Sequence, residues 1–348
     1  MICKNCILTE NECPNIKFND KGVCNYCQEF YWKEKQRRID KTNWPWIVYE
    51  IKKQCKGKDY DCLLGLSGGV DSSMCLHYLI EQGLRPLCFS VDNGYQTPEA
   101  NENIMRLVEG LKVPYYRYNI NLEAFRGLQE AFIKAGLKNI EIPTDHILMA
   151  TTYEMANNYG IKYIISGGNL ATEGIMPEHF GYNANDLTHL KGVYKQITGK
   201  KLTGLPTISL LKYIYYRFIK GIKIIQPLNY YEYHRENSIK LLSEKYGYKP
   251  YGEKHGENIF TKWFQNIYLI QKFGLDKRIP HLSSMINSAQ ITRREALKEM
   301  KNLTWSNFVP KGFDPMVIAK IENHDYKDYP HSEYWWKLLS KIYKKLKC

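Results

Sequence analysis

The sequence predicts an α/β fold, in which a doubly wound parallel sheet is preceded by a four-cysteine zinc knuckle and followed by a helical C-terminal region. Three observations lead to this prediction. Short apolar runs alternate with amphipathic segments between positions 61 and 200, which is typical of a parallel sheet covered on both faces. Two C-x2-C pairs crowd the start of the chain, and charged helical patterns follow position 200. We therefore divide the chain into 1–30, the knuckle; 31–60, a helical connector; 61–200, the main domain; and 201–348, a helical region for substrate or partners.

The two cysteine pairs predict a metal site. "CKNC" supplies Cys3 and Cys6, and "CNYC" supplies Cys24 and Cys27, with the 17 residues 7–23 between the pairs. This spacing is typical of zinc bound by four thiolates, and such a closed site has no open position for catalysis. We expect a structural Zn²⁺ that serves folding or docking; an iron–sulfur cluster is the alternative. Cys13 has no partner at a metal spacing and is expected to be structural.

Composition and charge suggest a cytoplasmic protein. The chain of 348 residues has a net charge of +13. It contains no apolar run of membrane-spanning length and no basic-then-apolar leader pattern. A positive charge of this size suits nucleic acid, an acidic membrane or anionic small molecules, and it also suits a plain lysine-rich surface.

The main domain follows a connector that reads as helical with an interruption at Pro45. The runs "CLLGL", "PLCFSVDNG", "YYRYNI" and "IKYIISGGN" predict strands. Between them, "SSMCLHYLIEQG", "TPEANENIMRLVEGL", "LEAFRGLQEAFIKAG" and "DHILMATTYEMANNYG" predict helices, with Thr97 as a cap and Pro98 in the first turn of the second. Ligands of such a sheet are expected at the carboxyl ends of its strands.

The first strand is joined to its helix by a loop suited to phosphate. It comprises Ser67, Gly68, Gly69, Val70, Asp71, Ser72 and Ser73. Glycines allow a tight turn that exposes backbone N–H groups, the helix N-terminus adds partial positive charge, and the serines add hydroxyls. A Walker loop is excluded because no Lys stands beside the Ser, and the G-x-G-x-x-G pattern is also absent. The alternative is a plain turn with a serine cap.

The residues "SGGVDSS" resemble the pyrophosphate loop (PP-loop) of the ATP pyrophosphatase family. The resemblance implies that residues 61–200 bind ATP, which is cleaved between its α and β phosphates while AMP passes to a substrate oxygen. It also implies that Asp71 helps to hold Mg²⁺, with Glu173 either a second metal carboxylate or a solvated loop acid. The nucleotide-binding residues implied in this way are Ser67, Gly68, Gly69, Asp71, Ser72, Ser73, Asp92, Gly167, Gly168, Asn169 and Glu173.

Three classes of function then compete: sulfur insertion into tRNA, replacement of an activated oxygen by ammonia, and a binding protein with a relict loop. Thiolases that relay sulfur on their own thiols need reactive cysteines near the site. This chain has no cysteine between positions 89 and 347, and Cys62, Cys75 and Cys88 fall in predicted core elements. We also find no glutaminase arrangement, so ammonia would have to come from a partner.

The segment from Tyr251 to Met300 is dense in polar residues. Helical spacing places Glu257, Thr261 and Gln265 on one face, and the interleaved aromatic residues are expected to pack it. Phosphate or carboxylate could be bound by Lys254, Lys277 and Arg278. Proton transfer or substrate contact could come from His255 and His281. The alternative for each of these residues is a solvated helical surface or a structural histidine.

The motifs "YGEKHGENIFTKWFQ", "FGLDKR", "HLSSMI" and "ITRREAL", together with "GVCNYC" and "LPTISLLKYIYYR", resemble the N-acetyl sugar amidotransferase family. Its members install acetamidino groups on bacterial surface sugars of lipopolysaccharide and flagella. The resemblance implies that ATP adenylates the amide oxygen of an N-acetylated sugar and that ammonia displaces AMP. Ammonia would come from a separate glutaminase subunit with a cyclase-like subunit, and no nucleic acid is expected. The candidate catalytic residues are Asp71, Lys254, His255, Lys277 and Arg278. A PP-loop tRNA-thiolating enzyme is the alternative.

The segment 205–234 mixes apolar residues with Lys212, Arg217, Lys220 and Lys223. These charges recur as on one side of a helix, and they are too many for a membrane span. The segment could lie on a membrane surface, cover the active site, dock partner subunits, or be an insertion helix packed on its own domain.

Overall fold

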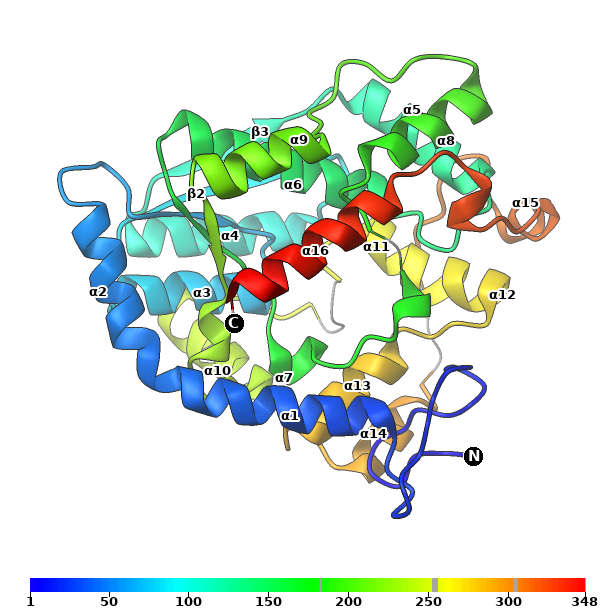
Figure 1. The fold of residues 1–348 in the computed structure, drawn as a ribbon, viewed down its shortest axis with the longest axis horizontal. Coiled ribbons are helices and arrows are strands. Elements are labelled where there is room, and N and C mark those ends of the chain that lie inside the picture. The colour runs from blue at the N-terminus through cyan, green and yellow to red at the C-terminus, as the bar shows by residue number, and fades with distance from the viewer. Residues whose placement is uncertain (182, 252–255, 303–305, 348) are drawn as a thin grey trace.

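A five-stranded, fully parallel sheet in the order β3-β2-β1-β4-β5 organises the chain (Figure 1). The computed structural model describes residues 1–181, 183–251, 256–302 and 306–347. The strands are β1 (Cys62–Gly65), β2 (Pro86–Asp92), β3 (Tyr115–Asn119), β4 (Tyr163–Ile165) and β5 (Lys223–Ile225). Because β1 lies between β2 and β4, the order reverses there, and the crevice beyond its carboxyl end is where such sheets bind ligands.

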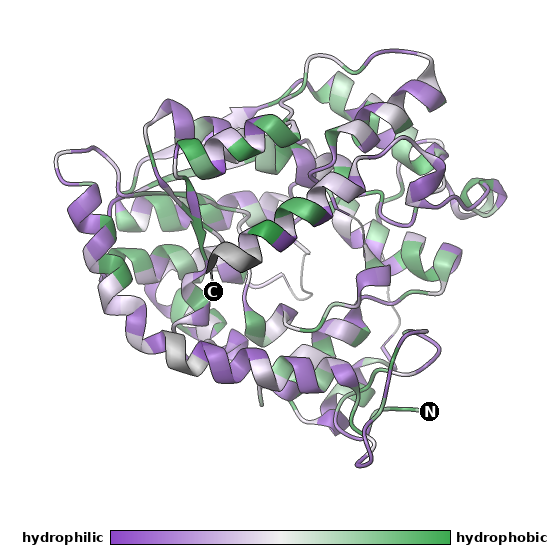
Figure 2. Cartoon of the chain, in the orientation of Figure 1, coloured by the Kyte–Doolittle hydropathy of each residue, from purple (hydrophilic) through white to green (hydrophobic). Residues whose placement is uncertain are grey.

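Helices cover both faces of this sheet, as predicted. Along β1, Cys62 and Leu64 belong to the apolar cluster of α3 (Val70–Glu81), whereas Leu63 belongs to the cluster of α6 (Ile142–Asn158). Alternate side chains of a strand point to opposite faces, so both faces are buried, which explains the continuous apolar run. Accordingly, α3 is largely hydrophobic, whereas α1 (Asn25–Asp40) on the outside is mostly hydrophilic (Figure 2).

The remaining helices of the main domain are α4 (Pro98–Leu111), α5 (Leu122–Lys134), α7 (Leu170–Glu173), η2 (Glu178–Phe180) and α8 (Leu187–Thr198). The predicted start of α4 is confirmed: Thr97 Oγ1 accepts a hydrogen bond from the backbone N–H of Ala100 at 3.2 Å, and Pro98 opens the helix. Pro tolerates this position because its missing N–H would have no helical partner there.

The connector contains α1, the short η1 (Lys41–Asn43) and α2 (Trp44–Gln54). Pro45 lies in the first turn of α2, so the predicted interruption is confirmed. Because α1 begins at Asn25, inside the second cysteine pair, the helix runs through the position where the knuckle was divided from the connector. The knuckle and the connector therefore share one helix.

The C-terminal region is helical, as predicted. Its elements are α9 (Leu210–Ile214), η3 (Tyr215–Ile219), η4 (Pro227–Asn229), α10 (Arg235–Tyr246), α11 (Ile259–Trp263), η5 (Phe264–Tyr268), α12 (Leu269–Phe273), α13 (Arg278–Asn287), α14 (Arg293–Glu299), α15 (Pro315–Lys320), η6 (Tyr326–Asp328) and α16 (Glu333–Lys347). The sheet nevertheless takes its fifth strand, β5, from beyond position 200. Among the described residues, no helix combines the length and the apolar character needed to cross a bilayer.

The segment 205–234 is not one amphipathic helix, so that interpretation was wrong. Lys212 lies on α9 and Arg217 on the π-helix η3, but Lys223 begins β5. Gly221, at φ +68°, turns the chain out of the helix, which glycine allows without steric cost. Arg217 then holds the turn, because its Nη1 donates to the Ile222 carbonyl at 2.6 Å. Three residues of the segment, Lys223–Ile225, are therefore part of the central sheet.

Candidate functional site

The loop between β1 and α3 is held in place by its own hydroxyl groups. The backbone N–H of Gly69 donates to Ser67 Oγ at 3.1 Å, and Ser72 Oγ donates to the Gly69 carbonyl at 3.2 Å. The first helical hydrogen bond of α3 runs from the Ser73 N–H to Gly69. The preceding N–H groups of the first turn have no intrahelical partner and point out of the helix end. The loop thus presents backbone donors to an anion.

Two glycines allow this loop to approach its neighbours. Gly68 has φ +82°, and a Cβ added there would lie 2.3 Å from the Ala100 carbonyl oxygen, so the loop packs directly on the first turn of α4. A Cβ on Gly167 would lie 3.1 Å from the Ser72 nitrogen. The loop after β4 therefore reaches the first turn of α3, and the two predicted loops meet at one site.

A cavity of about 240 Å³ lies where these loops meet, and charged side chains face it from several elements. Asp71, Glu173 and Glu257 supply carboxylates, and Arg235 supplies a guanidinium. Carboxylate oxygens are the ligands that Mg²⁺ prefers, and guanidinium suits phosphate. The residues present therefore fit a Mg²⁺–polyphosphate group, as the loop pattern led us to expect.

A tyrosine orients the carboxylate of the loop. The Tyr233 hydroxyl donates to Asp71 Oδ1. Burial, and then the charge of Asp71, raises the pKa of Tyr233 far above its usual range, so the phenol stays a donor. Sequence reasoning missed Tyr233 and Arg235 because they stand more than 150 positions after the loop, in a segment without a recognisable spacing.

A larger cavity of about 630 Å³ continues from the first and shares Ser67, Glu173 and Glu257 with it. One end lies against the carboxyl end of β2, at Phe89 and Val91. Further apolar and polar wall residues there are Leu148, Met176, Ser90 and Asn93. Apolar walls with a few polar groups are typical of ligand pockets, and this end has the character that a nucleoside requires.

The opposite end of this cavity is polar and belongs to the C-terminal region. Glu257, Thr261 and Gln265 all line it, but they do not share one α-helix, because Glu257 precedes α11 and Gln265 lies on the π-helix η5. Lys277 and His281 also reach it. The Lys277 ammonium lies 5.0 Å from the centre of the Phe264 ring, and His281 Nδ1 lies 3.2 Å from the Thr172 carbonyl oxygen. Five of the polar side chains singled out from the sequence therefore meet around one space.

Two further carboxylates at this end were missed. Glu141 accepts a hydrogen bond from Thr261 Oγ1, and Asp145 follows one turn later on α6. Asp145 is exposed and lines the cavity, and the protein around it raises its pKa from 3.8 to about 7, first by desolvation and then by the charge of Glu141. Lys277 opposes this shift. Asp145 can therefore exchange a proton near neutral pH.

Several residues expected at the site lie elsewhere. Asp92 lines neither cavity, because its Oδ2 binds Arg117 Nη2 at 2.6 Å. Arg278 binds Asp276 at 2.7 Å and the Asn302 carbonyl at 2.9 Å, and it too lines neither cavity. Ser73 is fully buried behind the loop, and its hydroxyl has no hydrogen-bond partner among the described residues.

In the loop after β4, too, some of the residues expected at the site have structural roles instead. Asn169 is buried as the cap of α7, with Oδ1 accepting from Thr172 N at 2.9 Å. A Cβ on Gly168 would lie 2.8 Å from Gln226 Nε2, so this glycine makes room for a neighbour. Lys254 and His255 lie outside the described residues.

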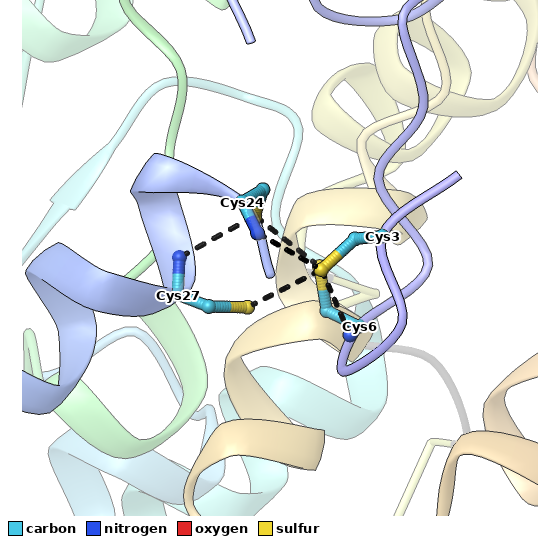
Figure 3. A group of neighbouring side chains, drawn as sticks. All are labelled: Cys3, Cys6, Cys24 and Cys27. Carbon is cyan, nitrogen blue, oxygen red and sulfur yellow. Dashed lines mark hydrogen bonds between the residues drawn. The ribbon is translucent and has the colours of Figure 1, made fainter. Parts of the chain in front are cut away.

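The four paired cysteines form one cluster (Figure 3). Cys3 and Cys27 Sγ atoms lie 4.0 Å apart, Cys6 and Cys24 Sγ atoms lie 3.8 Å apart, and all four fall within 4.8 Å of one another. A tetrahedral metal with sulfur bonds of about 2.3 Å separates its ligands by roughly 3.8 Å. The cluster therefore fits a tetrahedral thiolate-bound metal, and the four cysteines of the predicted ligand set do come together.

The cysteine cluster is attached to the C-terminal region. Asn287 Nδ2 on α13 donates to Cys27 Sγ at 3.3 Å, and Asn5 Nδ2 donates to Asn287 Oδ1 at 2.9 Å. Arg293 Nε on α14 donates to the Cys6 carbonyl at 3.1 Å. The pKa of Cys27 is far below its usual value because the thiols of Cys24 and Cys6, and then the two asparagine amides, donate to it. In Figure 1 the N-terminal loop lies beside α13 and α14.

The other cysteines cannot easily act as thiolates. All nine cysteines in the described part of the chain are buried. Desolvation raises the pKa of Cys62 and Cys75 well above the usual range and that of Cys88 to about 12. The thiolate is the reactive form, so these side chains are poor sulfur carriers, as their predicted core positions suggested.

Comparison with known proteins gives three kinds of likeness. Residues 257–346 match the family model described as "LPS biosynthesis protein WbpG-like, C-terminal domain". The "Uncharacterized protein MJ1599" of Methanocaldococcus jannaschii is 25% identical over 305 residues, which cover 86% of this chain and 93% of that protein.

Solved structures include the NMN synthetase of Francisella tularensis, with 14% identity, a TM-score of 0.34 and coverage of 79% of this chain and 99% of that one. The NH3-dependent NAD synthetase of Campylobacter jejuni has 15% identity, a TM-score of 0.29 and coverage of 66% and 99%. TM-scores this low support no conclusion, so the fold is defined by the strand order itself. Residues 257–346 form a domain similar to the C-terminal domain of WbpG-like LPS-biosynthesis proteins, which confirms the family resemblance predicted from the motifs of this region.

Proposed function

We propose that this chain is an ATP-dependent amidotransferase that adenylates the amide oxygen of an N-acetylated bacterial surface sugar and replaces it with ammonia. The products would be an acetamidino sugar, AMP and pyrophosphate. One observation supports this most: the cavity of the phosphate loop opens into a larger cavity, whose far wall is the WbpG-like domain. A nucleotide and a second substrate can therefore meet between them.

The chemistry follows from the positions of the side chains. An amide carbon is a poor electrophile, and transfer of AMP to its oxygen creates a leaving group. In the small cavity, Asp71 and Glu173 would hold Mg²⁺, while Arg235 and the loop N–H groups would offset the charge of the β and γ phosphates. In the large cavity, Lys277 would stabilise the phosphate that bridges to the substrate oxygen.

The second step needs a proton acceptor, since ammonia gains a positive charge when it attacks the adenylated carbon. AMP then leaves with the electrons of the C–O bond, and the nitrogen loses a proton. Asp145 lies in the cavity with a pKa of about 7, which suits a general base at neutral pH. His281 is a second candidate for this role.

The remaining components are part of the same proposal. The metal at the cysteine cluster would be Zn²⁺ in a structural role, because four thiolates leave no open position. Ammonia would come from a separate glutaminase subunit with a cyclase-like subunit. The tRNA-thiolation alternative is less well supported, because the described cysteines outside the cluster are buried and their thiols hold their protons.

The test combines the purified chain with ATP, Mg²⁺, an ammonium salt and a panel of N-acetylated sugars. We expect AMP, and a sugar product that is lighter by the difference between an oxygen atom and an NH group, as measured by mass spectrometry. ADP as the nucleotide product would contradict cleavage between the α and β phosphates. Formation of AMP without a change in any sugar would support ATP cleavage at this site but contradict the proposed substrate class.

A further inference from the structure

A third cavity, of about 370 Å³, lies inside the C-terminal region. Its walls come from α10, the π-helix η5, α13 and α14. The side chains of Gln265, Lys277 and His281 line both this cavity and the large one. The two spaces are thus adjacent across three polar side chains. We call the third cavity the inner chamber.

The wall between the two spaces is made by three side chains from η5 and the start of α13. Lys277 and His281 are four residues apart at the start of α13, so they lie on one face of that helix. Gln265 comes from η5, and its neighbour Asn266 also lines the chamber. A π-helix inside a helical run is rare and is often found at functional sites. A ligand in the chamber could place one group among these three side chains.

The chamber has one apolar side and a polar mouth. Leu282 and Met285 on α13 and Ile291 before α14 are half-buried and supply the apolar side. The mouth is lined by exposed Glu236, Glu295 and Glu299. A pyranose ring has the same two characters, since its C–H face packs on apolar side chains and its hydroxyl groups need acceptors and donors.

The charges of the chamber do not favour a polyanion. Arg235 pairs with Glu236 at 3.4 Å, and Arg278 pairs with Asp276 at 2.7 Å. The carboxylate of Glu295 is held by the backbone N–H of Thr292 at 2.7 Å. Phosphates are better matched by the small cavity, where the backbone N–H groups of the phosphate loop face the space. The chamber itself suits a ligand recognised through hydroxyl groups.

We propose that the inner chamber binds the ring of one N-acetylated monosaccharide and points its acetamido group between Gln265, Lys277 and His281 into the nucleotide cavity. This inference rests on the proposed function and locates its sugar. Lys277 would contact the acetamido oxygen, which must reach the α-phosphate. Larger substituents of the sugar would extend into solvent through the mouth between α10 and α14. Most of the chamber's lining belongs to residues 257–346, the part similar to WbpG-like proteins.

Binding can be tested without turnover. Saturation-transfer NMR would use the full-length protein with N-acetylglucosamine, N-acetylgalactosamine and N-acetylneuraminic acid as probes, and glucosamine as the control without an acetyl group. We expect at least one N-acetylated probe to bind, with its acetyl methyl strongly saturated. Met285→Trp should fill the chamber and lower that signal at least tenfold, while the ATP signal stays at the wild-type level. Met316→Trp, at an exposed position on α15, should bind as the wild type does.

Three outcomes would overturn the inference. Either no N-acetylated probe binds the wild type, or the sugar signal survives in Met285→Trp. The third is that filling the chamber raises the ammonium concentration needed for turnover and leaves the sugar signal unchanged. The last outcome would make the chamber an ammonia conduit. If Met285→Trp does not fold, Ile291→Phe fills the same space from the other wall. Asp71→Asn separates this inference from the proposed function: it should slow AMP formation by about 10²–10³-fold and still bind sugar. Sugar binding without AMP formation by the wild type would contradict the function alone.

Discussion

Asn287 Nδ2 lies 3.3 Å from Cys27 Sγ, so the last residue of α13 is bound to the cysteine cluster. The other end of the same helix presents Lys277 and His281 to the large cavity. Because α13 is ten residues long, the cluster and the cavity are joined by a rigid element. The N-terminal knuckle therefore supports the site although it contributes no residue to either nucleotide cavity.

Removal of the cluster metal should therefore affect both stability and activity. Structural zinc contributes about 10 kcal/mol or more in small zinc domains, and without it the four cysteine side chains lose the bonds that hold the loop together. We expect Cys24→Ser to lose the metal, to unfold at a temperature lower by several degrees, and to form little AMP. Metal analysis, thermal unfolding and AMP release measure these effects. Cys13→Ser, at a buried cysteine outside the cluster, should keep its metal; loss of metal from both variants would contradict the ligand set.

Asp71 and Asp92 provide a matched pair of carboxylates, since Asp71 lies just after β1 and Asp92 is the last residue of β2. Asp71 faces the small cavity, whereas Asp92 is paired with Arg117. We expect Asp71→Asn to lower the rate of AMP formation by about 10²–10³-fold, because a fixed charge at the phosphates is lost. Asp92→Asn should keep a rate near that of the wild type. Similar rates for the two variants would contradict the placement of the Mg²⁺ site.

The fold could be predicted because local signals and packing agree in it. The apolar run of β1 has neighbours on both faces, and Thr97 caps α4, so the pattern and the structure have the same cause. The strand β5 was missed because its residues follow a basic amphipathic stretch, and its three positions are too few to show a period. Its pairing with β4 is a tertiary effect.

The site could be predicted only where one short segment supplies it. The phosphate loop is continuous in sequence, so one short turn brings all its hydrogen-bond donors together. Tyr233 and Asp145 come from distant elements, and nothing in their neighbourhood shows that they face the loop or the cavity. Lys277 and Arg278 are adjacent in sequence, yet only Lys277 lines the nucleotide cavity, because adjacent residues at a helix start point about 100° apart.

The close approach of Gly68 to α4 predicts a large cost for a single methyl group. Gly68→Ala would place a Cβ 2.3 Å from the Ala100 carbonyl oxygen and also strain a φ of +82°. Strain at a positive φ alone costs roughly 1–2 kcal/mol. Gly57→Ala is the control for this strain alone, because Gly57 has φ +78° and no neighbouring atom within 4 Å of an added Cβ. We expect Gly68→Ala to lower the free energy of unfolding by about 3 kcal/mol or more and to abolish AMP formation. Equal unfolding curves in urea for the two variants would show that the loop can move away from α4.

The raised pKa of Asp145 predicts a pH dependence of stability. Its folded-state pKa is about 7 instead of 3.8, first because of desolvation and then because of Glu141. Between these two values the unfolded chain has released the proton that the folded chain keeps, so the stability contributed by this group falls as pH rises through about 4 to 7 and then levels off. Asp145 is exposed, so solvent screens the effect and it should be modest.

Asp145→Asn removes this titration while keeping the shape of the side chain. The variant should gain stability relative to the wild type as pH rises from about 4 to 7, and the difference should be constant above that range. Thermal unfolding measured across the pH series would show it. Glu109→Gln, at an exposed carboxylate on α4, should follow the wild-type curve. A difference between Asp145→Asn and the wild type that stays constant from about pH 4 to 7 would mean that the Asp145 carboxyl is already ionised in the folded protein over this range. It would then be unsuited to accept a proton at neutral pH.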